Sequence, residues 1–112
     1  MPANEHTNGL ISKDVLSKLR ATSILINCAR GAVVDQKALT EGLQNGKFRA
    51  GIDVFEEEPV SKDDPILQVD DRSILTPHIA YKTNEALLRR AQITVENLIN
   101  FKEGRDTNRV DQ

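Results

Sequence analysis

The sequence has few of the residues that mark several protein classes. Its 112 residues include one cysteine, Cys28, and aromatic residues make up 4%. A single cysteine excludes an internal disulfide framework and fits a reducing cytoplasm. The low aromatic content argues against a surface that stacks nucleic-acid bases.

Long hydrophobic runs and a dominant charge of one sign are also missing. Even the longest apolar runs are short, such as the one from Ser23 to Ile26, so we expect no membrane span. The start, Met1 to Asn4, has no basic or apolar region typical of a signal peptide. The net charge is -2 and no basic stripe stands out, which argues against a nucleic-acid partner. With 38% hydrophobic and 29% charged residues, the composition is that of one soluble domain with a small core.

Three helices are predicted from residues that can cap them. A short polar side chain at a helix start can accept a hydrogen bond from an early helical N–H group. A glycine or asparagine is typical of a helix end. The expected helices run from Ser12 to about Leu19, from Asp35 to Asn45-Gly46, and from Thr83 to about Phe101, the last with an apolar stripe of Leu88, Ala91, Val95, Leu98 and Phe101.

Three short apolar segments, partly β-branched, predict buried strands at 23–28, 49–55 and 73–76. Residues 56–72 are polar and are expected to be irregular. Strands that alternate with helices indicate an α/β fold with a parallel sheet of about three strands. The first strand of such a sheet would have an unpaired edge unless another chain or segment covers it.

Four polar side chains follow the predicted strands. Arg30 comes after the first strand, Asp53 and Glu58 at or beyond the end of the second, and His78 after the third. Ligands of open parallel sheets bind beyond the carboxyl ends of the strands. We therefore expect a cation, two acids and an imidazole at one edge of the sheet, a set suited to acid–base chemistry on an anionic substrate.

Each candidate also has a plainer interpretation. Arg30 offers a planar fork of donors that matches a carboxylate, or is a surface arginine in a turn before a helix. Gly31 beside it allows a tight turn or the close approach of a ligand. His78 is a proton donor and acceptor, or a histidine satisfied by the backbone. Glu58 could orient a protonated His78, or belong to a solvated acidic run at 56–58.

The remaining polar and sulfur groups carry weaker signals. Asp53 lies between two apolar residues, and a carboxylate there is costly to bury without a partner. It is therefore expected at an exposed strand end or hydrogen-bonded to a specific group. Cys28 is expected to be a small buried packing residue, and His6 to be solvated. No residue pattern predicts a metal site or a cysteine nucleophile.

Four segments resemble motifs of the D-2-hydroxyacid dehydrogenases. The segment INCARG at 26–31 is similar to their N-x-A-R-G motif, and DVFEEEP at 53–59 to their D-V-F-x-x-E-P motif. The segment LTPHIA at 75–80 is similar to their T-P-H motif, and the opening loop at 2–7 to the loop that precedes the first motif. The order and spacing of the four segments resemble the family over nearly the whole chain.

The resemblance implies a Rossmann-type, doubly wound parallel sheet, present here in part, and an oxidoreductase mechanism. A hydride would pass between NAD(P)H and a small 2-keto or D-2-hydroxy acid. Arg30 would bind the substrate carboxylate and polarise the keto oxygen, His78 would exchange a proton with that oxygen, and Glu58 would hold His78 and tune its pKa. Parents in this family are commonly dimers, so the resemblance also allows a homodimer.

The resemblance further implies a cofactor site of defined residues. These are Pro2, Thr7, Cys28, Ala29, Arg30, Asp53 and His78, with Asp53 on the nicotinamide side. The six glycines form no G-x-G-x-x-G fingerprint, which in the family lies upstream and binds the pyrophosphate. Residues 1–104 are thus expected to be the C-terminal half of a dinucleotide-binding domain, from a truncated or excised chain, with a polar tail at 105–112.

Two functions from different classes follow. The chain is a fragment of a D-2-hydroxyacid dehydrogenase that binds cofactor weakly or not at all by itself, and the choice between NAD and NADP stays open. Alternatively, it is a non-catalytic remnant or a self-association module that uses its open sheet edge or last helix. The missing glycine loop distinguishes the two hypotheses, because an active enzyme needs a substitute for this loop and an association module does not.

Overall fold

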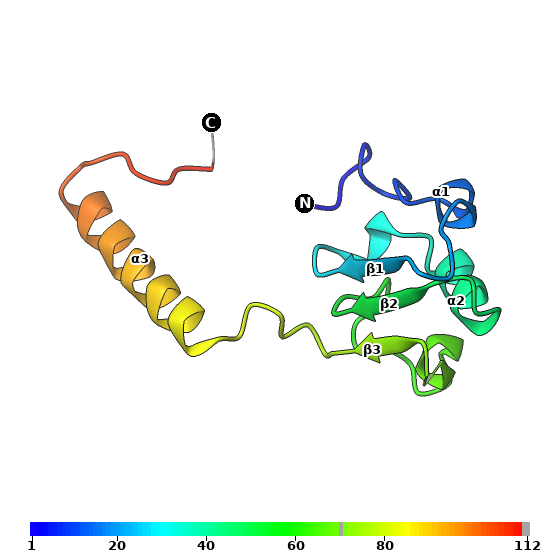
Figure 1. The fold of residues 1–112 in the computed structure, drawn as a ribbon. Coiled ribbons are helices and arrows are strands. Elements are labelled where there is room, and N and C mark those ends of the chain that lie inside the picture. Colours follow the sequence, from blue (N-terminus) through cyan, green and yellow to red (C-terminus); the bar gives the residue numbers. More distant parts are fainter. Residues whose placement is uncertain (70, 111–112) are drawn as a thin grey trace. The chain divides into compact units, whose positions relative to one another are not determined.

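The computed structural model describes residues 1–69 and 71–110. The chain divides into two compact units, Met1–Ile79 and Ala80–Gln112, and each is described by itself (Figure 1). The first unit contains the sheet and every candidate site residue. The second contains the last helix.

A three-stranded parallel sheet forms the centre of the first unit. Its strands are β1 (Ile24–Asn27), β2 (Arg49–Ile52) and β3 (Ser73–Leu75), in the order β1-β2-β3. Asn27 lies opposite Ile52, and Ile52 opposite Leu75, so the three carboxyl ends are level. The predicted α/β fold with a partial Rossmann-type parallel sheet is confirmed.

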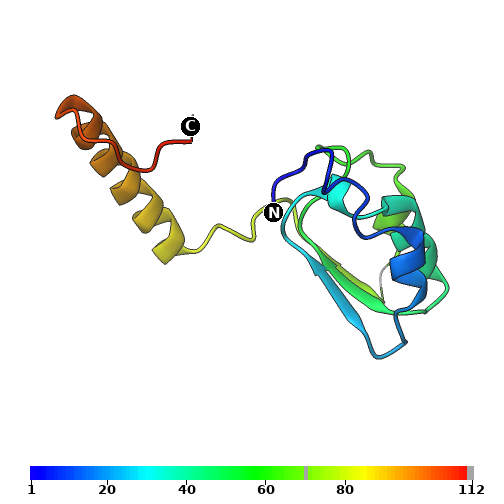
Figure 2. The ribbon, with the colours of Figure 1, turned by 90° about the horizontal axis from the view of Figure 1, so that it is seen from above.

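Two helices, α1 (Lys13–Ser17) and α2 (Gln36–Gln44), lie on the same side of this sheet (Figure 2). The side chain of Ser12 caps α1 and that of Asp35 caps α2, as predicted. Two 3-10 helices, η1 (Gly31–Val33) and η2 (Pro65–Gln68), complete the unit. The second of them lies in the segment that was expected to be irregular.

The core lies between the sheet and these helices, and the opposite face of the sheet carries exposed isoleucines. Leu43 and Phe48 are almost fully buried on the helical side. Ile24, Ile26 and Ile74 are 64%, 70% and 73% exposed. Side chains alternate between the two faces of a strand, so covering one face leaves the other half of each strand in solvent. The described residues of this unit therefore form two layers, with an apolar face uncovered.

Two predicted boundaries are wrong by a few residues. Helix α1 ends at Ser17 and not at Leu19, because the N–H of Lys18 turns back to the carbonyl of Val15. The strand predicted at 49–55 ends at Ile52, and the next three residues leave the sheet while remaining buried. Burial of this loop explains why its sequence looks like a continued strand.

The second unit is built around α3 (Asn84–Lys102), with Thr83 as the predicted cap. Gly104 ends it in a left-handed conformation, and the N–H of Arg105 bonds to the carbonyl of Asn100 at 2.8 Å. None of its residues is buried, so the predicted apolar stripe is exposed. The tail bonds back to the helix, for example from Asn108 to Asn97. In the described ranges, no helix has the length and apolarity to span a bilayer.

Candidate active site

The loop after β1 presents Arg30 at the carboxyl end of the sheet. Asn27, the last residue of β1, is buried and holds this loop by two bonds. Its side-chain amide donates to the carbonyl of Arg30 at 3.0 Å, and its side-chain oxygen accepts from the N–H of Ala29 at 3.1 Å. The Arg30 side chain is exposed, and among the described residues its guanidinium donates one hydrogen bond, to the carbonyl of Ala29 at 2.6 Å. Its remaining donors can therefore bind an anion.

The same loop corrects one prediction. Cys28 was expected to be a buried packing residue, but it is exposed. The strand ends one residue earlier, at Asn27, whose side chain turns inward and closes the loop. Cys28 is thereby left on the outer side, in the loop that the family resemblance assigns to the cofactor.

Gly31 lets the loop after β1 contact the loop after β2. A Cβ atom at this position would lie 1.9 Å from the backbone carbon and oxygen of Phe55. The close approach that Gly31 allows is therefore that of the chain's own backbone. Gln36 adds a second link, because its side-chain oxygen accepts from the N–H of Glu56 at 2.8 Å. These contacts fix where the loop that carries Glu58 begins.

The carboxylate of Asp53 is buried, with 3% of the residue exposed, and is hydrogen-bonded to the turn after β3. Its Oδ1 accepts from the hydroxyl of Thr76 at 2.5 Å and from the N–H of Ile79 at 2.8 Å. Its backbone carbonyl accepts from the N–H of His78, also at 2.8 Å. Of the two predicted alternatives, the one realised is a carboxylate bonded to specific groups.

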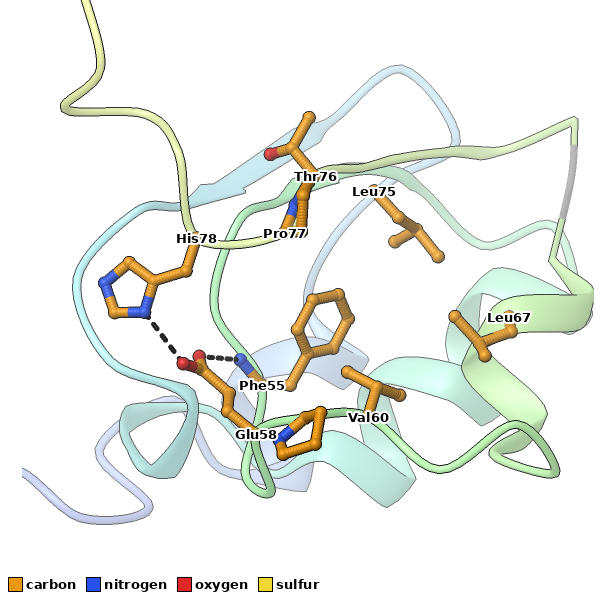
Figure 3. A pocket seen from close by; sticks show the side chains of 9 residues that line it. Phe55, Glu58, Val60, Leu67, Leu75, Thr76, Pro77 and His78 are labelled. Carbon is orange, nitrogen blue, oxygen red and sulfur yellow. Dashed lines mark hydrogen bonds and ion pairs between the residues drawn. The ribbon is translucent and has the colours of Figure 1, made fainter.

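Glu58 and His78 form a hydrogen-bonded pair at the end of this arrangement (Figure 3). The Nδ1 atom of His78 lies 2.8 Å from Oε2 of Glu58, and the N–H of Phe55 donates to the other carboxylate oxygen at 3.0 Å. The side chains are 40% and 37% exposed, so solvent reaches both. The expected contact between them is present, while its catalytic role stays a prediction.

The surroundings of Glu58 favour its charged form. The hydrogen bond from His78 and then that from the Phe55 N–H lower the pKa of Glu58, with smaller contributions from the positive charges of His78 and Arg30. An ionised carboxylate can only accept, so Nδ1 of His78 is the donor in this pair. Proton exchange with any substrate is then left to Nε2.

A hollow of about 410 Å³ lies next to this pair. Its walls are mainly apolar, with Glu58 and His78 at one end (Figure 3), and Thr76 also lines it. Apolar walls keep water from one side of this pair and so strengthen its hydrogen bond. The remaining lining residues are Phe55, Pro59, Val60, Leu67, Leu75 and Pro77.

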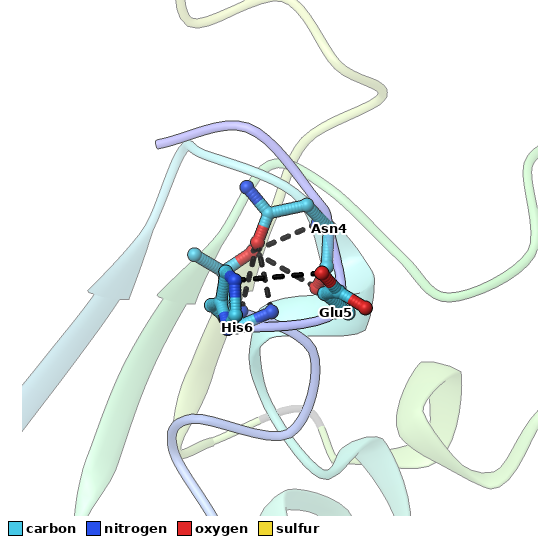
Figure 4. A network of polar contacts seen from close by, with 4 residues as sticks. Asn4, Glu5 and His6 are labelled. Carbon is cyan, nitrogen blue, oxygen red and sulfur yellow. Dashed lines mark hydrogen bonds and ion pairs between the residues drawn. The ribbon is translucent and has the colours of Figure 1, made fainter.

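The opening loop is folded on itself and tied to η1. The side chain of Asn4 accepts from the N–H groups of His6 and Thr7, and Glu5 pairs with His6 at 3.5 Å (Figure 4). The hydroxyl of Thr7 donates to the carbonyl of Pro2 at 2.7 Å. A bond from the N–H of Gly9 to the carbonyl of Ala32 holds the loop beside η1, two residues after Arg30. The assignment of Pro2 and Thr7 to the cofactor site stays a prediction.

Sequence reasoning overlooked two positioning side chains, Asn27 and Thr76. Each is a polar residue at or just after the end of a parallel strand, which is the signal that could have found them. Within the described ranges, no three histidine, cysteine, aspartate or glutamate side chains gather as metal ligands.

Comparison with known proteins decides the family. A family model for the D-isomer specific 2-hydroxyacid dehydrogenase, NAD binding domain, matches residues 1–80. The chain belongs to this family. The match contains all the candidate residues, from Pro2 to His78, and confirms the resemblance carried by the four motifs.

Relatives of the family cover nearly all of this chain. Glyoxylate reductase of Korarchaeum cryptofilum is 44% identical over 93% of the chain, and D-3-phosphoglycerate dehydrogenase of Archaeoglobus fulgidus is 41% identical over the same share. The chain spans 31% of the first relative and 20% of the second. The D-lactate dehydrogenase of Aquifex aeolicus, solved with NAD and lactic acid, matches with 36% identity and a TM-score of 0.79. This match covers 93% of the chain and 36% of that structure.

The contact between Gly31 and Phe55 predicts that adding one methyl group at position 31 strongly destabilises the fold. Gly31→Ala places a Cβ in the backbone of Phe55, so the two loops must separate. We expect a loss of unfolding free energy above the ~1–3 kcal/mol typical of overpacking. Urea unfolding measures it. Gly51→Ala is the matched control, because a Cβ there meets only Ile26, at 3.8 Å. Equal stabilities of the two variants would contradict the close packing.

The lowered pKa of Glu58 predicts a contribution to stability that acid removes. A carboxyl group with a lower pKa in the folded state stabilises the fold above its ordinary pKa, and loses this effect as pH falls through the lowered value. The difference in unfolding free energy between the wild type and Glu58→Gln should therefore be largest near neutral pH and shrink in acid. Urea titrations across the acid range test this, with Glu57→Gln as control. The same pH dependence for both variants would rule out the assignment to Glu58.

Proposed function

We propose that this chain is the nicotinamide-facing, catalytic half of the NAD-binding domain of a D-2-hydroxyacid dehydrogenase. The reaction would be hydride transfer between NAD(P)H and a small 2-keto or D-2-hydroxy acid. The observation that carries the proposal is the grouping of Arg30 with the Glu58–His78 pair at the carboxyl edge of the sheet. Relatives named glyoxylate reductase and D-3-phosphoglycerate dehydrogenase act on acids of this class.

The roles follow from the chemistry of each side chain. The guanidinium of Arg30 binds the substrate carboxylate and polarises the keto oxygen. His78, with Nδ1 bonded to Glu58, donates a proton from Nε2 to that oxygen during reduction and takes it back during oxidation. Glu58 fixes the direction of the ring, because its carboxylate is hydrogen-bonded to Nδ1. The chemistry that NAD(P)H supplies when bound is the hydride.

The residues at the sheet edge fit a nicotinamide group. The loop of Cys28, Ala29 and Arg30 is held by Asn27, and it lies where open parallel sheets bind their ligands. His78 lies at the same edge, with the buried Asp53 bonded to the turn that carries it, and the folded Pro2–Thr7 loop is tied to the turn that follows Arg30. The sequence has no glycine fingerprint for the pyrophosphate, so these residues hold the nicotinamide half of the cofactor only.

The domain and cellular assignments remain part of the proposal. Residues 1–104 would be the C-terminal half of a dinucleotide-binding domain, and 105–112 a polar tail. The exposed thiol of Cys28 fits a reducing cytoplasm, because a free surface thiol is prone to oxidation elsewhere.

The ligand site can be tested on the chain itself by NMR. We expect NADH at millimolar concentration to shift the backbone amides of Cys28, Ala29 and His78, and oxamate, an unreactive 2-keto acid analogue, to add shifts that Arg30→Ala removes. Arg20→Ala is the control, because Arg20 is an exposed arginine that precedes β1. Oxamate shifts that persist in Arg30→Ala would contradict the role of Arg30, and no response to either ligand would contradict binding by this chain.

Self-association is a second candidate function, favoured by the uncovered apolar sheet face of Ile24, Ile26 and Ile74. Proteins rarely leave a contiguous apolar face in solvent, and a homodimer would cover it. We expect the chain to form dimers that Ile26→Lys weakens in light scattering. Val15→Lys, which places the same charge on an exposed position of α1, should leave them intact. A monomer at all concentrations would exclude this function.

A further inference from the structure

His78 is held in an unusual backbone conformation. Its φ is 54°, in the left-handed region that a residue with a side chain rarely adopts. Such a conformation persists only when surrounding contacts determine it. The direction of the His78 ring therefore depends on what holds the turn on either side of it.

Asp53 supplies contacts on both sides of this turn. The hydroxyl of Thr76, two residues before His78, and the N–H of Ile79, one residue after it, donate to the same carboxylate oxygen. The N–H of His78 itself donates to the backbone carbonyl of Asp53. The turn is thus closed on one buried residue that directly follows the neighbouring strand β2.

Thr76 is the residue of this turn whose side chain binds the carboxylate of Asp53. It follows β3 directly, and its own N–H continues the sheet by donating to the carbonyl of Ile52 at 2.9 Å. Its backbone is thereby fixed, which places the hydroxyl against Asp53. Pro77 next to it further restricts the backbone of Thr76 to extended conformations.

We propose that Thr76 is a positioning residue that aims the His78 ring at Glu58 through its bond to Asp53. The hydroxyl ties the start of the turn to the buried carboxylate, and the left-handed conformation of His78 then directs Nδ1 toward Glu58. The catalytic value of this arrangement rests on the function proposed above. The positioning itself does not, because it concerns a contact within the chain.

The pKa of Glu58 reports on this positioning. The bond from His78 is the largest cause of its lowered pKa, so a displaced ring raises the pKa toward its ordinary range. Carboxyl carbon NMR titrations measure it without cofactor or substrate. The positioning by Thr76 can therefore be refuted while ligand binding is observed, and ligand binding can be refuted while the positioning is observed.

Two variants of Thr76 separate the hydroxyl from the shape of the side chain. Thr76→Val keeps the shape and removes the hydroxyl, and should produce most of the pKa increase seen in His78→Ala. Thr76→Ser keeps the hydroxyl and should stay close to the wild type. Urea unfolding of both variants shows whether the fold is retained. A Glu58 pKa in Thr76→Val equal to that of the wild type would overturn the proposal.

The wild-type chain provides a test that does not depend on the folding of a variant. A hydroxyl bonded to a buried carboxylate exchanges its proton slowly with solvent, and so does the N–H of Ile79 on the same oxygen. We expect a separate NMR signal for the Thr76 hydroxyl and slow exchange of the Ile79 amide. Rapid exchange of both protons would overturn the proposal.

Discussion

The burial of one carboxylate organises the candidate site. Asp53 leaves the sheet at the end of β2 with 3% of its surface exposed, and a buried charge is stable only when donors surround it. Donors come from the turn after β3, namely the hydroxyl of Thr76 and the N–H of Ile79. Satisfying this charge therefore connects two neighbouring strand ends and sets the position of His78. A chain that only needed to pack apolar surface would not place an acid there.

The loops at the sheet edge are pre-organised by contacts within the chain. Asn27 closes the loop of Arg30, and Gly31 lets that loop lie against the backbone of Phe55. Phe55 in turn donates its N–H to Glu58, which holds the His78 ring. Side chains that are held in place before the ligand arrives need less reorganisation during a reaction. Arg30 is exposed and the His78 side chain is partly exposed, which agrees with groups that meet a ligand from solvent.

Local sequence features predicted the helices and strands well. The features that were missed depend on contacts between residues far apart in the sequence. The caps Ser12, Asp35 and Thr83 were found because a cap depends on residues only a few positions away. The end of β2 was misplaced because the loop after it is as buried as a strand. Apolar residues indicate that a segment is buried, but they do not show whether it is a strand or a loop. The bond of Thr76 to Asp53 was missed because the two residues are 23 positions apart and meet only through the register of β2 and β3.

The central claim is that Glu58 holds Nδ1 of His78 and leaves Nε2 to exchange a proton with substrate. The most direct measurement is a long-range proton–nitrogen NMR spectrum of the His78 ring, at a pH where the ring is neutral. The account predicts the tautomer with the proton on Nδ1, because the charged carboxylate at 2.8 Å can only accept. A neutral ring that carries its proton on Nε2 would show that Glu58 does not hold it, and would contradict the account.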